Sequence, residues 1–196
     1  FGVRLEAFDP SGIIANAEMS LINTYDLTNQ EAGRFSAFEN GQDGYVPEVI
    51  ETRIPLLDDN YKLPWLCQSI DLSVLDAQND SVNVGSFQLN YLTGNNSGEI
   101  SIPFIETRNA AILNSARAIK AIMFPDGAEG GTQALPKDYL MRMTIYIYDK
   151  HSYSTRLFEI QHLVALQTGS IPLDATNRGG VGIVTLNFIK MFPMLK

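Results

Sequence analysis

The residues best able to do chemistry in this chain are two histidines, one cysteine and a pair of adjacent aspartates. His151 falls in a turn-like stretch, whereas His162 lies among apolar residues. A metal site needs several His, Cys or carboxylate ligands that converge, and these few residues are scattered along the sequence. Asp58 and Asp59 can hold a cation, but adjacent carboxylates in a turn are usually solvated, and no further acids follow at the spacing of a metal-binding loop. We therefore expect no metal and no cofactor.

The sequence also lacks the patterns that prepare a nucleophile. It contains no Gly-x-Ser-x-Gly elbow and no Cys/His signature, and a nucleophile needs a positioned base. Residues 126–136 are rich in glycine and small residues but lack the Lys-Ser ending of a phosphate-binding loop, so we interpret them as a mobile connection. Paired acids can hydrolyse glycosides, but spacing in the sequence does not show their separation in space. We expect the chain not to be an enzyme.

The composition predicts one sizeable core in an acidic protein. The chain has 196 residues, of which 45% are hydrophobic and 18% charged, and its formal net charge is −8. A groove for nucleic acid needs a basic patch, which the sequence lacks. The acidity favours solubility, or a surface that repels polyanions. Cys67 is the only cysteine, so no intrachain disulfide can form, and we expect it to be a small buried residue.

Membrane association is not predicted. No apolar run approaches the roughly 18 residues that a membrane helix needs. The chain begins at Phe1 rather than at methionine, and its first residues show no basic-then-apolar export signal. We therefore expect no membrane partner.

The most regular pattern lies in residues 86–124. Phe87, Leu89 and Tyr91 alternate with polar residues, and residues 99–104 repeat this alternation after a turn rich in glycine and asparagine. The pattern predicts a β-hairpin of residues 86–91 and 99–104 around the turn at 93–98. One face of this hairpin is apolar, and we expect it to pack against the element that follows.

That element is a helix. Either Thr107 or Asn109 can cap its start, and Phe124-Pro125 ends it because proline cannot continue the hydrogen-bond ladder. One apolar stripe at helical spacing contains Ile112, Ala116, Ile119 and Met123. We expect this stripe to lie on the apolar face of the sheet.

Further strands are predicted on both sides of this unit. They cover residues 49–56, 63–74, 139–148, 156–167 and 181–192, and residues 77–81 are interpreted as a polar loop. Pro55 marks the first of these strands as an edge strand, or marks its end. Residues 1–44 have only patchy periodicity and cannot make a core alone, so we interpret them as an N-terminal arm or extension.

In the order of these elements the chain resembles the tail tube proteins of contractile-tailed bacteriophages and, more distantly, the tube proteins of type VI secretion. The matching segments are residues 48–57 with 61–72 as an opening hairpin, 86–93 and 98–123 as a strand-hairpin and helix, and 140–147, 158–169 and 183–192 as closing strands. The helix entry Glu106-Thr107-Arg108-Asn109 and a bend at residues 163–173 also match. The resemblance covers residues 45–195 and brings no catalytic motif.

The resemblance implies a fold and a role. The fold is mainly β with one flanking α-helix, a small β-barrel or sandwich of the phage tail tube type that occupies residues 45–196. Hexameric rings of the chain stack into the inner tail tube of a virion, and the chain is made in the host cytoplasm. The implied partners are further copies of the chain, the tail sheath, tape measure, baseplate and tail terminator proteins, and genomic DNA that passes through the lumen without specific binding. An acidic lumen repels phosphates, so the DNA slides.

Two sets of residues are candidates for roles in such a tube. The polar strand faces either line the lumen or meet solvent on a monomer, and both readings remain open. The lumen-lining candidates are Gln88, Asn90, Glu99, Ser101, Thr185 and Asn187. The candidates for contacts between rings are Leu57, Asp58, Asp59 and Asn60, together with the arm at residues 1–44.

A function of another class also fits the sequence. An acidic β-sandwich with aromatic loops is also compatible with a monomeric module that binds carbohydrate or protein, such as an adhesin or a baseplate component. Tyr146, Tyr148 and Tyr153 then form a ligand platform, although aromatics at strand spacing more often pack in a core. Self-association separates the two functions, because a tube protein forms rings or fibres and a binding module can remain monomeric.

Overall fold

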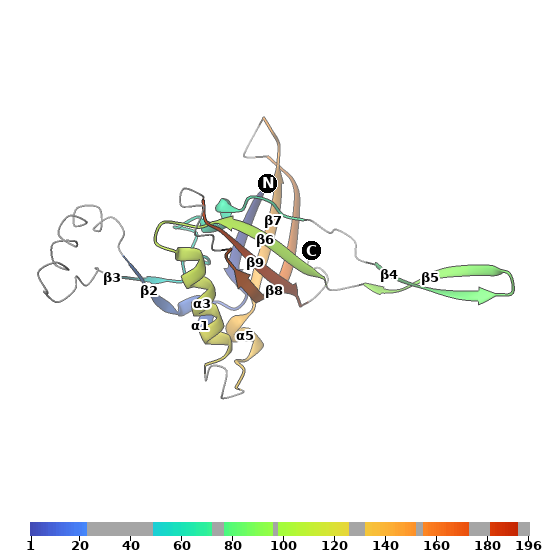
Figure 1. Ribbon diagram of the computed structural model, residues 1–196, viewed down its shortest axis with the longest axis horizontal. Coiled ribbons are helices and arrows are strands. Elements are labelled where there is room, and N and C mark those ends of the chain that lie inside the picture. Colours follow the sequence, from blue (N-terminus) through green and yellow to red (C-terminus); the bar gives the residue numbers. More distant parts are fainter. Residues whose placement is uncertain are drawn as a thin grey trace, which may run out of the picture.

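The computed structural model describes residues 1–22, 49–71, 77–95, 98–125, 132–151, 155–172 and 181–191. Its centre is a five-stranded antiparallel sheet in the order β1-β7-β8-β9-β6 (Figure 1). These strands are β1 (Gly2–Ala7), β6 (Glu99–Ile105), β7 (Met141–Tyr148), β8 (Arg156–Ser170) and β9 (Ile183–Lys190). Two further two-stranded sheets join β2 (Glu18–Ile22) with β3 (Val49–Arg53), and β4 (Ala77–Val84) with β5 (Phe87–Asn95).

Alternating apolar residues place one face of the main sheet in the core. In β6 and β9 the buried apolar residues lie directly opposite one another, and they are Ile100, Ile102, Phe104, Val184, Leu186 and Phe188. Opposite side chains on one sheet face contact each other and stabilise the pairing. The alternation that predicted the strands β7, β8 and β9 is confirmed. Strand β7 begins later than expected because Pro136 starts a short helix, α5 (Pro136–Tyr139).

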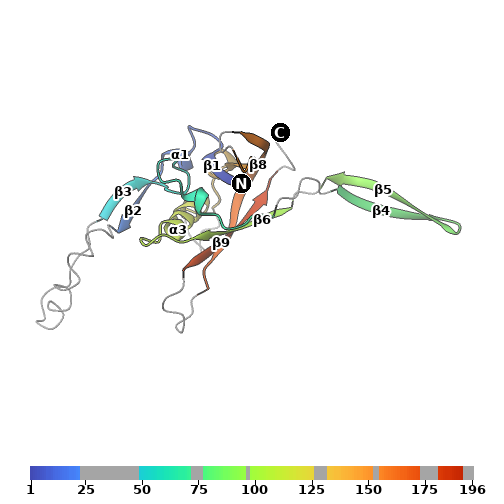
Figure 2. The same ribbon diagram turned by 90° about the horizontal axis from the view of Figure 1, so that it is seen from above.

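Helix α3 (Ala111–Met123) packs on the apolar face of the main sheet (Figure 2). The predicted stripe is confirmed, because Ile112 and Ile119 are fully buried, Met123 is nearly so, and Ala116 is half-buried. The helix ends at Met123, before the predicted Phe124-Pro125 break. Two short helices, α1 (Ile13–Asn16) and α5, contact α3 and extend this layer.

The start of α3 is capped by one of the two predicted residues, Thr107, and by Glu106, which was not predicted. Ala110 is the residue before the first helical turn, in a left-handed conformation with φ 52°. The predicted capping residue Thr107 does contribute, since its Oγ1 accepts the N–H of Ala111 at 2.9 Å. The Glu106 carboxylate accepts the N–H groups of the next two helical residues, at 3.0 Å each. Asn109 is not a cap, because Glu106 and Thr107 already occupy the N–H groups at this helix end.

The main sheet is curled, so that one segment contacts both of its outer strands. The 3-10 helix η1 (Leu63–Leu66) contacts β1 at one edge and β6 at the other. Just after it, Cys67 forms an isolated bridge with Phe104, and Gln68 donates its N–H to the Pro103 carbonyl at 2.9 Å. Residues 63–71 are therefore not the predicted strand. Pro64 at the start of η1 favours this turn.

The prediction of a mainly β fold with a flanking helix is confirmed. Of the two forms expected, the closed barrel is not present in the part of the chain that the structure describes, because β1 and β6 pair with no strand on their outer sides. The curled sheet stays open, and η1 lies across the opening.

The predicted hairpin between residues 86–91 and 99–104 is wrong. Strand β5 pairs with β4, through a tight turn at Gly85-Ser86 where Gly85 has φ 64°, and β6 pairs with β9. Residues 77–81, expected to be a polar loop, belong to β4. Alternation along one strand shows which face is apolar but not which neighbour it pairs with. The β4–β5 hairpin projects away from the main sheet (Figures 1 and 2).

The first 22 residues are not an arm. Strand β1 pairs with β7 along its whole length, and Val3 and Leu5 are buried in the core. Strand β2 pairs with β3, and its Leu21 is also buried. The expected boundary at residue 44 therefore separates strands that pack together, while residues 23–44 of the proposed arm lie outside the described residues. Sequence periodicity failed here because the alternation of Val3 and Leu5 does not show that their partner is β7, far along the chain.

Candidate functional site

Four of the six lumen-lining candidates lie together on the outward face of β6 and β9. Ser101 lies directly opposite Asn187, and Glu99 and Thr185 share their face because side chains two positions apart point the same way. Asn187 donates its Nδ2–H to Oγ1 of Thr168 on β8 at 2.8 Å. We call Glu99, Ser101, Thr185 and Asn187 the polar face. Glu99 is its only carboxylate, so this surface is polar more than acidic.

The other two candidates lie elsewhere. Gln88 and Asn90 are on β5, opposite Asn83 and Ser81 of β4. Within the described residues, β5 pairs with no strand of the main sheet. The six candidates therefore belong to two separate surfaces, and a role in lining a lumen stays a prediction for both.

The opposite face of the β4–β5 hairpin is apolar and uncovered. Val82 lies opposite Leu89 and Val84 lies opposite Phe87, so their side chains share one face. The exposed fractions are 74% for Phe87, 58% for Leu89, 56% for Val84, and 48% for both Val82 and Tyr91. We call these five residues the apolar hairpin face. The expectation that its β5 half packs against the helix is wrong, and an uncovered apolar face of this kind marks an interaction surface.

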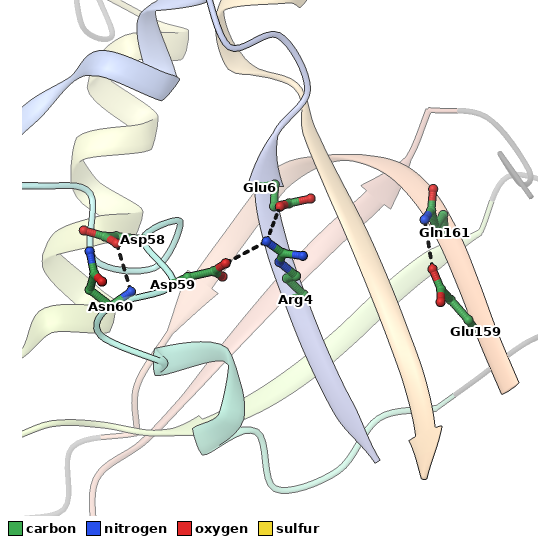
Figure 3. Close-up of polar contacts among 7 residues, drawn as sticks. All are labelled: Arg4, Glu6, Asp58, Asp59, Asn60, Glu159 and Gln161. Atoms are coloured by element: carbon green, nitrogen blue, oxygen red, sulfur yellow. Dashed lines mark hydrogen bonds and ion pairs between the residues drawn. The ribbon is translucent and has the colours of Figure 1, made fainter. Parts of the chain in front are cut away.

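The turn with the four ring-contact candidates is held against its own β1 strand (Figure 3). The Arg4 guanidinium lies between Glu6 and Asp59, at 2.7 and 2.6 Å from their carboxylates. The hydrogen bond to Asp59 raises the pKa of Arg4 above its ordinary value, because it favours the charged form. Asp58 accepts the N–H of Asn60 at 2.9 Å.

The exposure of this turn is uneven. Leu57 packs against the core and is half-buried, whereas Asp59 and Asn60 are exposed. Only the polar part of the turn is therefore free to contact another ring. Whether it does so stays a prediction.

The aromatic residues proposed as a ligand platform are mostly covered. The Arg156 guanidinium lies 4.3 Å from the ring centroid of Tyr146, which is 7% exposed. Tyr148 stacks on Trp65 with ring centroids 6.1 Å apart, and Tyr153 lies outside the described residues. The exposed ring of this cluster is Trp65, at 62%. Sequence reasoning placed Trp65 within a strand and so missed its exposure.

The residues best able to do chemistry lie in different surroundings. His162 is buried and His151 is exposed in a turn. Cys67, expected to be buried, is half-buried, and desolvation raises the pKa of its thiol from 9.0 to about 11. Among the described residues, no group of three or more His, Cys, Asp or Glu side chains is placed to hold a metal ion. No helix in the described ranges is long and apolar enough to cross a membrane.

No protein-family model matches this chain, and no curated protein matches it. Among solved structures, the chain is similar to one chain of a structure described as the tail of an empty GTA particle, computed with helical refinement in C6 symmetry. The two chains share 14% sequence identity with a TM-score of 0.40, over 65% of this chain and 79% of that chain. A similarity of this size does not establish a function.

Proposed function

We propose that the chain is a non-catalytic structural subunit that assembles with copies of itself through the β4–β5 hairpin. The observation that carries this proposal is the apolar hairpin face, which projects from the main sheet with Phe87 74% exposed. An isolated two-stranded hairpin is at best marginally stable in water, because it has no second layer to bury its apolar side chains. A hairpin with five exposed apolar side chains on one face is therefore stabilised when another surface buries that face.

The energetic gain from covering this face favours assembly and is large enough to be measured. Full burial of a Phe or Leu side chain contributes about 1.5–3 kcal/mol relative to exposure in water. Phe87 and Leu89 are 74% and 58% exposed, so the two together contribute about 3 kcal/mol per contact, or roughly a hundred-fold in affinity. Such a contact between different surfaces of identical subunits generates rings or filaments.

Within this role, the resemblance to tail tube proteins favours the inner tube of a contractile phage tail. Hexameric rings then stack into a conduit for DNA in the virion, surrounded by the sheath and in contact with the tape measure, baseplate and tail terminator proteins. The outer edge of β1, which pairs with no strand among the described residues, supports lateral joining, because an unpaired strand edge is a template for a neighbour. The polar face, with Glu99 as its only acid, is the part of the sheet that we propose lines the lumen.

The test is assembly of purified protein, followed by sedimentation and negative-stain electron microscopy over a concentration series. We expect rings or tubes from the wild type. The double variant Phe87→Ser, Leu89→Ser should need roughly a hundred-fold higher concentration to assemble. The matched control, Gln88→Ser with Asn90→Ser, alters the other face of the same strand and should assemble like the wild type. Because all four side chains are exposed, thermal melts of the monomers should coincide.

Two outcomes contradict the proposal. Equal assembly of the apolar and polar double variants would show that the apolar hairpin face is not the contact. A wild type that remains monomeric at every concentration would favour the alternative, a monomeric module that binds carbohydrate or protein.

A further inference from the structure

Strand β8 has an unpaired edge over its last six residues. Its 15 residues pair with β7 only as far as Val164, which lies opposite Met141 at the start of β7. From residue 165 to residue 170 β8 pairs with β9 on one side, and no strand among the described residues pairs with its other side. An exposed strand edge presents free N–H and C=O groups that accept an added strand.

A groove lies beside this edge, between β8 and the C-terminal half of α3. Its volume is about 290 Å³. The apolar residues that line it are Leu113, Ala116, Met123, Phe124 and Leu166. Gly169, which also lines the groove, lets β8 pack closely here, since a Cβ at this position would meet the Leu186 side chain at 2.9 Å and the Ala116 Cβ at 3.8 Å. The groove therefore offers an apolar floor next to backbone hydrogen-bonding groups.

The charge at this groove is positive. Arg117 and Lys120 both line it and are exposed, and none of the described residues that line it is acidic. This is unusual in a chain with a formal net charge of −8. An occupant with an apolar face and a negative charge is therefore favoured.

We propose that this groove receives the β4–β5 hairpin of a second copy of the chain. The inference rests on the proposed self-assembly and names the surface that the hairpin contacts. Asp80 is the only charged residue of the hairpin. It lies opposite Tyr91, so its side chain is on the same side of the hairpin as the apolar hairpin face. There it can pair with Arg117 or Lys120 of a second copy. The hairpin projects from the far side of the main sheet relative to α3 in both views (Figures 1 and 2), so it does not cover the groove of its own subunit.

The contact is directional, because hairpin and groove are different surfaces. Each copy offers one hairpin and one groove, so every bound copy leaves a free hairpin at one end and a free groove at the other. Such a head-to-tail contact continues into a ring or a filament. A strand added to the free edge of β8 places alternate side chains toward the groove, which fits the spacing of Val82 and Val84, or of Phe87 and Leu89.

The first test is cross-linking between two variants of the full chain, each in a Cys67→Ser background. One variant carries Leu89→Cys and the other Gln167→Cys, which lines the groove. Under oxidising conditions we expect a disulfide-linked heterodimer in the mixture and little product from either variant alone. The matched control replaces Leu89→Cys with Asn90→Cys on the opposite face, and its yield should be at least about five-fold lower. Equal yields from the two hairpin positions, or no cross-link in assembled material, would overturn the inference.

The second test reverses the charges. The variant Arg117→Glu, Lys120→Glu should raise the concentration for half-assembly by about ten-fold or more, and mixing it with Asp80→Lys subunits should restore part of the loss. If the variant Phe87→Ser, Leu89→Ser loses assembly while the groove variant assembles normally, the proposed function stands and this inference fails. If neither variant changes assembly, both fail.

Discussion

Removal of the Glu106 carboxylate should lower the free energy of unfolding by an amount that follows from the hydrogen bonds it accepts. This one side chain accepts the N–H groups of Ile112 and Leu113 at the start of α3, at 3.0 Å each, and also the N–H of Thr107 at 2.8 Å. The next N–H along the chain, that of Asn114, donates to the backbone carbonyl of Ala110 at 3.0 Å. The first turn of the helix thus depends on a residue that precedes the helix.

The magnitude follows from the number of N–H groups released. Loss of a side-chain cap costs about 0.5–2 kcal/mol, and loss of a carboxylate near a helix N-terminus costs a further 0.3–1 kcal/mol or so. Glu106 is half-buried, so water replaces its hydrogen bonds only in part. We expect Glu106→Ala to lower the free energy of unfolding by about 2 kcal/mol, which corresponds to a fall in Tm of about 4–8 °C for a chain of this size. Glu106→Gln keeps one acceptor oxygen and should cost about half as much.

The assay is urea unfolding followed by circular dichroism at 25 °C, under conditions in which the chain is monomeric. The matched control is Glu99→Gln, because Glu99 is an exposed acid on β6 and should leave stability within about 0.5 kcal/mol of the wild type. If Glu106→Ala costs no more than this control, then Glu106 does not hold the helix start and our account of α3 is wrong.

Four further outcomes are expected. Ala110→Gly should stabilise the chain by about 1 kcal/mol in the same assay, because Ala110 has φ 52° and glycine adopts this conformation without steric cost; a loss of stability would contradict this. Gly169→Val should cost about 1–3 kcal/mol, because the new side chain meets the buried Leu186, whereas an unchanged melt would show that this site has room. Alkylation of Cys67 should accelerate as the pH approaches about 11, the pKa of its thiol in the folded chain. The free energy of unfolding should fall as the pH rises from about 9 to 11, because the thiol ionises at a lower pH in the unfolded chain. An acceleration of alkylation centred near pH 9 would refute the argument that burial raises this pKa. Glu99→Lys, which reverses the only charge of the polar face, should leave tube assembly intact and slow DNA passage in an ejection assay, and loss of assembly would refute the lumen placement.

Local patterns predicted those elements in which one face is buried by neighbours close in the sequence. The stripe of α3 and its end before Pro125 were predicted from helical spacing and proline chemistry, and both are confirmed. The alternation in β7 and β9 predicted those strands for the same reason. The Glu106 cap was not predicted, because it accepts N–H groups six and seven residues along the chain and matches no short capping pattern.

Strand partners were predicted poorly. The alternation of Phe87, Leu89 and Tyr91 identified an apolar face correctly, but the same pattern fits a strand in a core and a strand in a protruding hairpin. The short turn at Gly85-Ser86, preceded by Val82 and Val84, was the signal for the true partner. The true pairing also changes the candidate site. The β4–β5 hairpin is an exposed surface, and Gln88 and Asn90 lie on it and not on the polar face.

The sequence by itself determined the mainly β composition of the fold, the position of its principal helix and the acidic charge of the chain, because these depend on residue types and on periods of two to four residues. Only the tertiary structure decided that β1 belongs to the core, that β6 pairs with β9, and that the apolar hairpin face is exposed. The physical reason is that strand pairing joins residues far apart in the chain, such as Val3 with Ile145. Many partners satisfy the same alternation, and the packing of the whole chain selects one of them.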